Sequence, residues 1–134
     1  MFLNILLLTT CIINNAVNAK LSDDVMDDWN QVVARYATEC IEESGANPIV
    51  ALSLFNDRLL HDEEHIQCFI KCLNEKYGML SPDGEFHVDI WLNTIKHLTP
   101  EVANMCFNKY RQETDLCKRS YQLALCVAQE NYVE

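Results

Sequence analysis

The sequence predicts an all-α protein of about six helices, and three observations lead to that fold class. No segment shows the alternation of apolar and polar side chains that is typical of a strand. The three glycines and three prolines fall at the edges of apolar segments, where helices begin or end. Six of the seven cysteines lie beyond an N-terminal leader, and an even number in a short secreted chain indicates three disulfides.

The leader is the apolar N-terminal segment. Residues 2–13 (FLNILLLTTCII) have about the length of a signal-peptide core, and Val17 and Ala19 suit the −3 and −1 positions of a cleavage site. A membrane anchor would need about 20 apolar residues, but this run is interrupted at Asn14 and Asn15. We therefore expect a signal peptide over residues 1–19, removed on secretion together with its cysteine, and one extracellular domain over residues 20–134.

The first two expected helices start at residues that can cap a helix. The first, over residues 22–40, starts at Ser22, and two aspartates in its first turn suit the positive end of the helix dipole. The connection that follows ends at Gly45. Asn47 caps the second helix, where Pro48 stands at the first helical position and lacks only an N–H that would be unpaired there. Its apolar residues are Leu52, Leu54, Phe55 and Leu59.

The other four helices follow from apolar periodicity and from the turns between them. The third covers residues 62–78, and the turn 81-SPDG-84 leads into the fourth. The fifth starts at Thr99 and Pro100, and the sixth covers residues 115–131. The fourth helix has apolar residues at i, i+3, i+4, i+7 and i+10, which are Val88, Trp91, Leu92, Ile95 and Leu98.

Helical geometry limits how the cysteines can pair. Cys68 and Cys72 are one turn apart on the third helix and face the same side. Cys117 and Cys126, nine residues apart on the sixth helix, differ by about half a turn. They cannot pair with each other in an intact helix, so this helix is tied to two different places. A zinc site would need a second cysteine pair at matching spacing, and the sequence has none.

The cysteine spacing resembles that of the insect odorant-binding proteins. Successive mature cysteines are separated by 27, 3, 33, 10 and 8 residues, and the segments 67-QCFIKCLNEKYGML-80 and 117-CKRSYQLALC-126 are also similar to the family. The gap of 33 is a little short for the family, and we expect the connection between the fourth and fifth helices to absorb the difference. Lipid-transfer proteins and seed albumins have adjacent cysteines, saposin-type domains have other gaps, and insect chemosensory proteins have four cysteines.

The resemblance implies an interlocked pairing and helices arranged around an apolar cavity. Each bridge would stabilise the chain by roughly 3–4 kcal/mol, which can offset the packing that a cavity forfeits. The implied pairs are Cys40–Cys72, Cys68–Cys117 and Cys106–Cys126.

The resemblance also implies a function, that of a secreted carrier that reversibly binds small hydrophobic ligands such as odorants, pheromones or similar semiochemicals. It implies no cofactor. The candidate protein partners that it implies are a chemosensory receptor or a second copy of the chain. The net charge of −10 argues against nucleic acid and anionic membranes as partners. We expect the cavity to be walled by the first, fourth, fifth and sixth helices, with the third closing one end. The candidate ligand-binding residues are Val88, Trp91, Ile95, Met105, Leu123, Val127 and Tyr132, followed by Phe69 and Ile70.

Two other functions are weighed against the carrier. The segment 61-HDEEH-65 matches the H-x-x-E-H pattern of inverted zinc proteases, but acidic residues at a helix start also suit the helix dipole. The sequence has no G-x-S-x-G motif and no glycine-rich phosphate loop, so we expect no enzyme and no metal site. A salivary or seminal interaction protein could use the same fold, and the sequence leaves that alternative open.

The short tail after Cys126 carries one further expectation. Its eight residues (127-VAQENYVE-134) resemble the tails of short-tailed family members, which lie over the cavity. In that arrangement Tyr132 and Val133 face inward. Protonation of carboxylates and of histidines such as His87 or His97 would then loosen the tail and lower ligand affinity at mildly acid pH.

Overall fold

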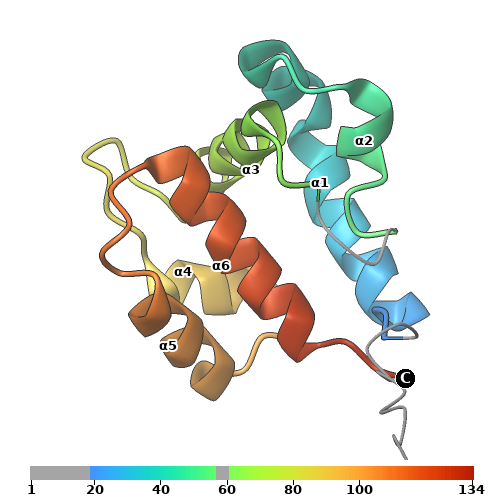
Figure 1. Ribbon diagram of the computed structural model, residues 1–134, viewed down its shortest axis with the longest axis vertical. Helices are drawn as coiled ribbons and strands as arrows, with labels where there is room; N and C mark the ends of the chain where they lie inside the picture. The colour runs from blue at the N-terminus through green and yellow to red at the C-terminus, as the bar shows by residue number, and fades with distance from the viewer. Residues whose placement is uncertain (1–18, 57–60) are drawn as a thin grey trace, which may run out of the picture.

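The computed structural model describes residues 19–56 and 61–134, and six α-helices make up most of this part of the chain (Figure 1). Within it the only β-type pairings are two isolated bridges, Lys20 with Val133 and Leu80 with Phe86. The expected all-α class is therefore confirmed. The helices are α1 (Asp23–Ser44), α2 (Pro48–Leu52), α3 (Glu64–Lys76), α4 (Val88–Thr94), α5 (Pro100–Lys109) and α6 (Leu116–Glu130).

Residues 1–18, which include nearly all of the expected leader, lie outside the described part of the chain. Leu59, expected on the second helix, lies outside it as well. Among the helices that are described, none combines the length and the apolar character needed to span a membrane.

Helix α3 occupies the centre of the arrangement. It packs against α6 on one side and α1 on the other, while α2 covers α1 and α3 (Figure 1). Helix α5 packs on α6, and α4 packs on α5. The C-terminus lies beside the start of α1 (Figure 1), where Lys20 and Val133 exchange two backbone hydrogen bonds of 3.0 and 2.7 Å.

Side-chain caps hold the starts of four helices. The side chains of Ser22, Asn47, Thr99 and Asp115 each accept a hydrogen bond from a backbone N–H in the first turn of α1, α2, α5 and α6. Helix α1 continues one turn beyond the expected end, because the next residue that readily adopts the left-handed conformation is Gly45, at φ 73°.

Helix α3 is two residues shorter at each end than the expected 62–78, and α2 and α4 also end earlier than the sequence predicts. Helix α2 ends at Leu52, because the hydroxyl of Ser53 donates to the carbonyl of Ile49 at 2.7 Å and closes the last turn. Leu54 and Phe55, expected on this helix, follow it in a turn. Apolar periodicity does not reveal this local hydrogen bond between a serine side chain and a backbone carbonyl.

Helix α4 was expected to continue to Leu98, and this prediction is wrong. The helix ends at Thr94, and Ile95 is already extended at ψ 108°. The following loop is held against α1 by His97, whose ring nitrogen Nε2 contacts the Asp28 carboxylate. The backbone of His97 is left-handed, at φ 67°. The chain must reverse direction here before Thr99 can cap α5.

The three disulfides join the pairs that the resemblance implies. They tie α1 to α3, α3 to α6 and α5 to α6, so the two cysteines of α6 do reach different helices. Because the ties are interlocked, α3 and α6 are fixed to each other and each to one further helix. The pairs are Cys40–Cys72, Cys68–Cys117 and Cys106–Cys126.

The buried side chains form two clusters rather than one. The first joins the N-terminal half of α1 to α4, α5 and α6 and contains both tryptophans, Trp29 and Trp91. The second joins the C-terminal half of α1 to α2 and α3 and contains Val33, Leu54 and Ile70.

Candidate functional site

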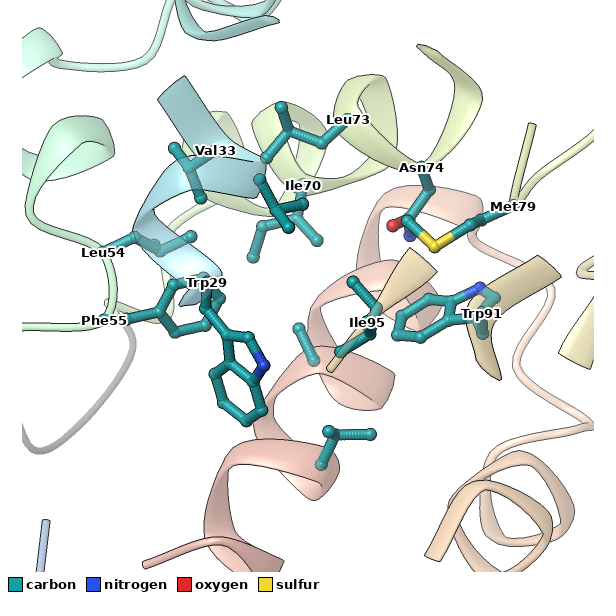
Figure 2. A pocket seen from close by; sticks show the side chains of 13 residues that line it. Trp29, Val33, Leu54, Phe55, Ile70, Leu73, Asn74, Met79, Trp91 and Ile95 are labelled. Carbon is teal, nitrogen blue, oxygen red and sulfur yellow. The ribbon is translucent and has the colours of Figure 1, made fainter. Parts of the chain in front are cut away.

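A pocket lies at the junction of the two core clusters, and its lining is almost entirely apolar (Figure 2). Its walls come from α1, α3, α4 and α6 and from the segments that follow α2, α3 and α4. Its volume is about 50 Å³. The lining residues are Trp29, Val32, Val33, Leu54, Phe55, Ile70, Leu73, Asn74, Met79, Trp91, Ile95, Ala124 and Val127.

The wall that α1 provides follows from its four-residue spacing. Val25, Trp29, Val33 and Ala37 are buried one turn after another, and they form one stripe along the helix. The two middle members of this stripe face the pocket.

The two tryptophans of the pocket differ in how their ring N–H is used. Trp29 donates from Nε1 to the carbonyl oxygen of Lys96 at 2.8 Å, and its ring meets Phe55 edge to face at a centroid distance of 5.2 Å. Trp91 packs edge to face on Phe107 at 5.5 Å. Its Nε1 is buried and finds no hydrogen-bond acceptor among the described residues.

Asn74 is the one amide in the pocket lining. Its side chain is 3% exposed, and its Nδ2 has no hydrogen-bond partner within the described part of the chain. Its backbone carbonyl accepts hydrogen bonds from Met79 (2.8 Å) and Leu80 (3.2 Å), which closes the turn after α3. The backbone of this residue is therefore fixed, while its amide group is left facing an apolar space.

The volume of the pocket limits what it can hold without movement. A water molecule needs roughly 10–15 Å³ of such space, and a cavity of about 150 Å³ is known to admit benzene. At about 50 Å³ the pocket holds a few small atoms only. A larger molecule would have to displace wall side chains, and the most adaptable are Met79, with its flexible thioether, and Phe55, which lies outside regular helix.

Four of the residues expected from the sequence lie on this pocket. Trp91 and Ile95 come from α4 and its C-cap, Val127 from α6 and Ile70 from α3. Although α4 ends before Ile95, the extended residue still directs its side chain to the pocket.

Five others lie elsewhere. Leu123 and Phe69 are fully buried in the two core clusters, and Val88 and Tyr132 are half-buried and pack against the first cluster. Met105 is 43% exposed at the surface. None of these five side chains lines the pocket.

The helices that form the walls of this pocket also differ from the expected ones. Helix α5 contributes no lining residue, because Ala103, Cys106 and Phe107 form its buried face and Met105 lies on the opposite side of the helix. Helix α3, expected only to close one end, supplies a main wall through Ile70, Leu73 and Asn74. Its central place between α1 and α6 accounts for this.

The sequence reasoning missed nine lining residues. The spacing of the α1 stripe could have identified Trp29 and Val33, since both continue a four-residue apolar repeat. An asparagine on the otherwise apolar buried face of α3 could likewise have identified Asn74. The missed residues are Trp29, Val32, Val33, Leu54, Phe55, Leu73, Asn74, Met79 and Ala124.

The C-terminal tail does not cover this pocket. Val133 is 49% exposed, so the expectation that it faces inward is wrong. Its backbone pairs with Lys20, which directs its side chain outward. Tyr132 packs against the first core cluster, and burial raises the pKa of its hydroxyl.

An ion pair holds the loop after α4 against α1. His97 Nε2 lies 2.7 Å from Asp28 Oδ2, and Lys96 Nζ lies 3.7 Å from Asp28 Oδ1. The hydrogen bond with His97 is the main cause that lowers the pKa of the Asp28 carboxyl. The neighbouring Trp29 bonds the same loop, so these contacts fix one wall of the pocket.

The H-x-x-E-H segment at residues 61–65 falls at the start of α3. His65 Nδ1 lies 2.8 Å from the carbonyl oxygen of Ser44 at the end of α1. This ring nitrogen is used in packing α3 on α1. Glu64 stands in the first turn of α3, the position expected for a carboxylate that interacts with the helix dipole.

One cluster contains residue types that bind metals. The Sγ atoms of Cys40 and Cys72 and a carboxylate oxygen of Glu43 lie within 4.8 Å of one another. The two sulfurs are joined in a disulfide, and only a thiolate binds metal strongly. The cluster is therefore explained by the bridge.

Comparison with known proteins gives a consistent result. The PBP/GOBP family model matches residues 22–130, which is nearly all of the described chain. No solved structure gives a significant match.

Three similar curated proteins come from Drosophila melanogaster. General odorant-binding protein 57d is 27% identical over 68% of this chain and 73% of its own length. General odorant-binding protein 99a is 25% identical over 84% of this chain and 83% of its own. General odorant-binding protein 57c is 24% identical over 89% of this chain and 82% of its own.

Proposed function

Because this chain belongs to the PBP/GOBP family of insect odorant-binding proteins, we propose that it is a secreted carrier of small hydrophobic molecules. Odorants, pheromones or similar semiochemicals would bind reversibly in the pocket between α1, α3, α4 and α6. The observation that carries this proposal is the apolar pocket at the junction of the two core clusters, in a chain tied by three disulfides.

The disulfides support this proposal energetically. A domain of this size buries only about two-thirds of its unfolded surface, and a cavity removes part of the remaining packing. Each bridge can contribute roughly 3–4 kcal/mol by constraining the unfolded chain. The helices can therefore stay folded around a space that a ligand enters and leaves.

The apolar lining supplies enough free energy for reversible binding. Burial contributes about 0.8 kcal/mol per CH₂ group, or roughly 10–13 kcal/mol for a chain of 12 to 16 carbons. Association costs at least about 4 kcal/mol, and displacing Met79 or Phe55 adds to that cost. The net corresponds to micromolar or weaker affinity, which suits a carrier that must release its ligand.

Secretion is part of the same proposal. Cleavage after Ala19 would leave Lys20 as the first residue, and an extracellular destination would keep all three disulfides oxidised. Intact-mass measurement of the secreted protein would give the cleavage point. A mature chain that retained residues 1–19 would contradict this part of the proposal.

The carrier function is tested by native mass spectrometry on the secreted protein. The protein is mixed with homologous series of linear alcohols, esters and hydrocarbons, and complexes are counted by mass. One ligand per chain is expected, with affinity rising as the carbon chain lengthens until the pocket can expand no further. Absence of a complex with every member of every series would overturn the proposal.

A further inference from the structure

We propose that the pocket selects neutral ligands carrying a hydrogen-bond-accepting oxygen, such as ketones, aldehydes, esters or alcohols, and that Asn74 recognises this oxygen. The inference rests on the proposed function, because it assumes that this pocket is where the ligand binds. It adds the chemical class of the ligand and names a specificity-determining residue.

The side-chain Nδ2 of Asn74 is buried and has no hydrogen-bond partner among the described residues. The residue is 3% exposed and lines the pocket, and its Nδ2 meets no acceptor in the described residues. A buried donor that has lost its water and gained no partner is costly. An unsatisfied buried donor therefore calls for an explanation, and a ligand that accepts its hydrogen bond supplies one.

The described surroundings of Asn74 show no structural role for its side-chain Nδ2. The buried face of α3 is otherwise formed by apolar residues and a disulfide cysteine, among them Ile66, Ile70 and Leu73. The turn that follows α3 uses the backbone carbonyl of Asn74, and the side-chain Nδ2 has no partner in the described part of the chain. A leucine, which has the same number and branching of side-chain heavy atoms, would continue the apolar face.

A second unpaired donor lies in the same lining. The Nε1 of Trp91 is buried with no acceptor among the described residues, whereas the Nε1 of Trp29 is bonded to Lys96. In Figure 2 the side chains of Asn74, Met79 and Trp91 gather on one side of the pocket, opposite Trp29. Both unpaired donors thus lie on the side from which α3 and α4 approach.

This pattern of donors defines the ligand class. An oxygen atom with lone pairs satisfies an N–H donor, whereas a hydrocarbon leaves it unpaired. A carboxylate would enter a pocket whose described lining residues include no cation, and burial of an unpaired charge is strongly unfavourable. The pocket therefore favours neutral oxygenated molecules over both hydrocarbons and ionised fatty acids.

The test measures how the Asn74→Leu substitution changes the relative affinities of two matched ligands. A linear methyl ketone and the alkane of equal chain length are each titrated against a displaceable fluorescent apolar probe. Asn74→Leu is expected to weaken ketone binding about tenfold, the effect of one lost hydrogen bond, and to leave alkane binding unchanged or stronger. Asn108→Leu, the same substitution at an exposed position of α5, is the matched control and should change neither affinity.

The unfolding temperature without ligand gives an independent readout. Asn74→Leu should fold and unfold at the same or a higher temperature than the unsubstituted protein, because an unpaired buried amide is replaced by an apolar group. Failure of this variant to fold, or a clearly lower unfolding temperature, would make Asn74 a structural residue and overturn the inference.

The possible binding results separate the inference from the proposed function. An unchanged ketone-to-alkane affinity ratio in Asn74→Leu would overturn the inference while leaving the carrier function intact. Failure of the unsubstituted protein to bind both ligands would overturn the proposed function, and the inference with it.

Discussion

Trp29 on α1 donates a hydrogen bond from its Nε1 to the backbone carbonyl of Lys96, 67 residues later in the chain, at 2.8 Å. The bond joins a pocket-lining side chain to the loop that ends α4. Asp28 and His97 pair directly beside it at 2.7 Å. The position of Ile95 in the pocket wall therefore depends on contacts made by α1.

Trp29→Phe should lower the free energy of unfolding by roughly 1–2 kcal/mol, because it removes this bond and leaves the Lys96 carbonyl without its donor. The matched control is Trp91→Phe, whose Nε1 has no partner among the described residues and whose loss should destabilise less. Urea unfolding of both variants measures the difference. Equal losses would mean that the bond to Lys96 contributes nothing to stability.

The Asp28–His97 pair should make stability depend on acid pH. The folded-state pKa of Asp28 lies below the ordinary value of 3.8, so its contribution is present above that pH and is lost as the pH falls through the lowered pKa. Unfolding temperatures measured between about pH 2 and pH 6 should therefore fall more steeply at the acid end for the unsubstituted protein than for Asp28→Asn. Parallel curves for the two proteins would contradict this account.

Deletion of residues 131–134 should reduce stability without reducing affinity. It removes the two backbone hydrogen bonds between Lys20 and Val133 and the packing of Tyr132, but no residue that lines the pocket. Thermal unfolding and ligand titration of the truncated protein separate the two effects. Weaker binding with an unchanged unfolding temperature would show instead that the tail acts as a lid.

Loss of the Cys106–Cys126 bridge should destabilise the protein by about 3 kcal/mol, because the unfolded chain regains the freedom of that loop. The variant replaces both cysteines by serine, and denaturant unfolding measures the change. Peptide mapping of the intact protein without reduction should recover this pair. Recovery of a Cys106–Cys117 peptide would contradict the interlocked arrangement.

Several helix starts, and the opposite directions of the two cysteines on α6, could be predicted from the sequence because they depend on local chemistry, whereas the disulfide pairs were implied by the family resemblance. Ser22 and Thr99 accept hydrogen bonds from backbone N–H groups within their own first turns. Cys117 and Cys126 point in opposite directions because of the helical repeat alone. These features need no knowledge of how the helices pack.

The end of α4 and the walls of the pocket could not be predicted, because they depend on contacts between distant segments. Helix α4 ends before Ile95 in a loop that Trp29 and Asp28 hold against α1. Met105 is apolar and lies near a buried cysteine in sequence, but its side of α5 faces solvent. Apolar periodicity marks a buried face, and packing decides whether that face meets another helix or a pocket.

The measurement that tests the central claim most directly compares ligand binding by Trp91→Ala and Met105→Ala. Both residues were expected at the ligand site from the sequence, but Trp91 lines the pocket and Met105 lies 43% exposed outside it, so the two substitutions test whether this pocket is the ligand site. Titration with a long-chain apolar ligand should show affinity lowered more than tenfold, or more than about 1.4 kcal/mol, for Trp91→Ala and unchanged for Met105→Ala. Unchanged affinity for Trp91→Ala, in a variant that remains folded, would contradict the assignment of this pocket as the ligand site.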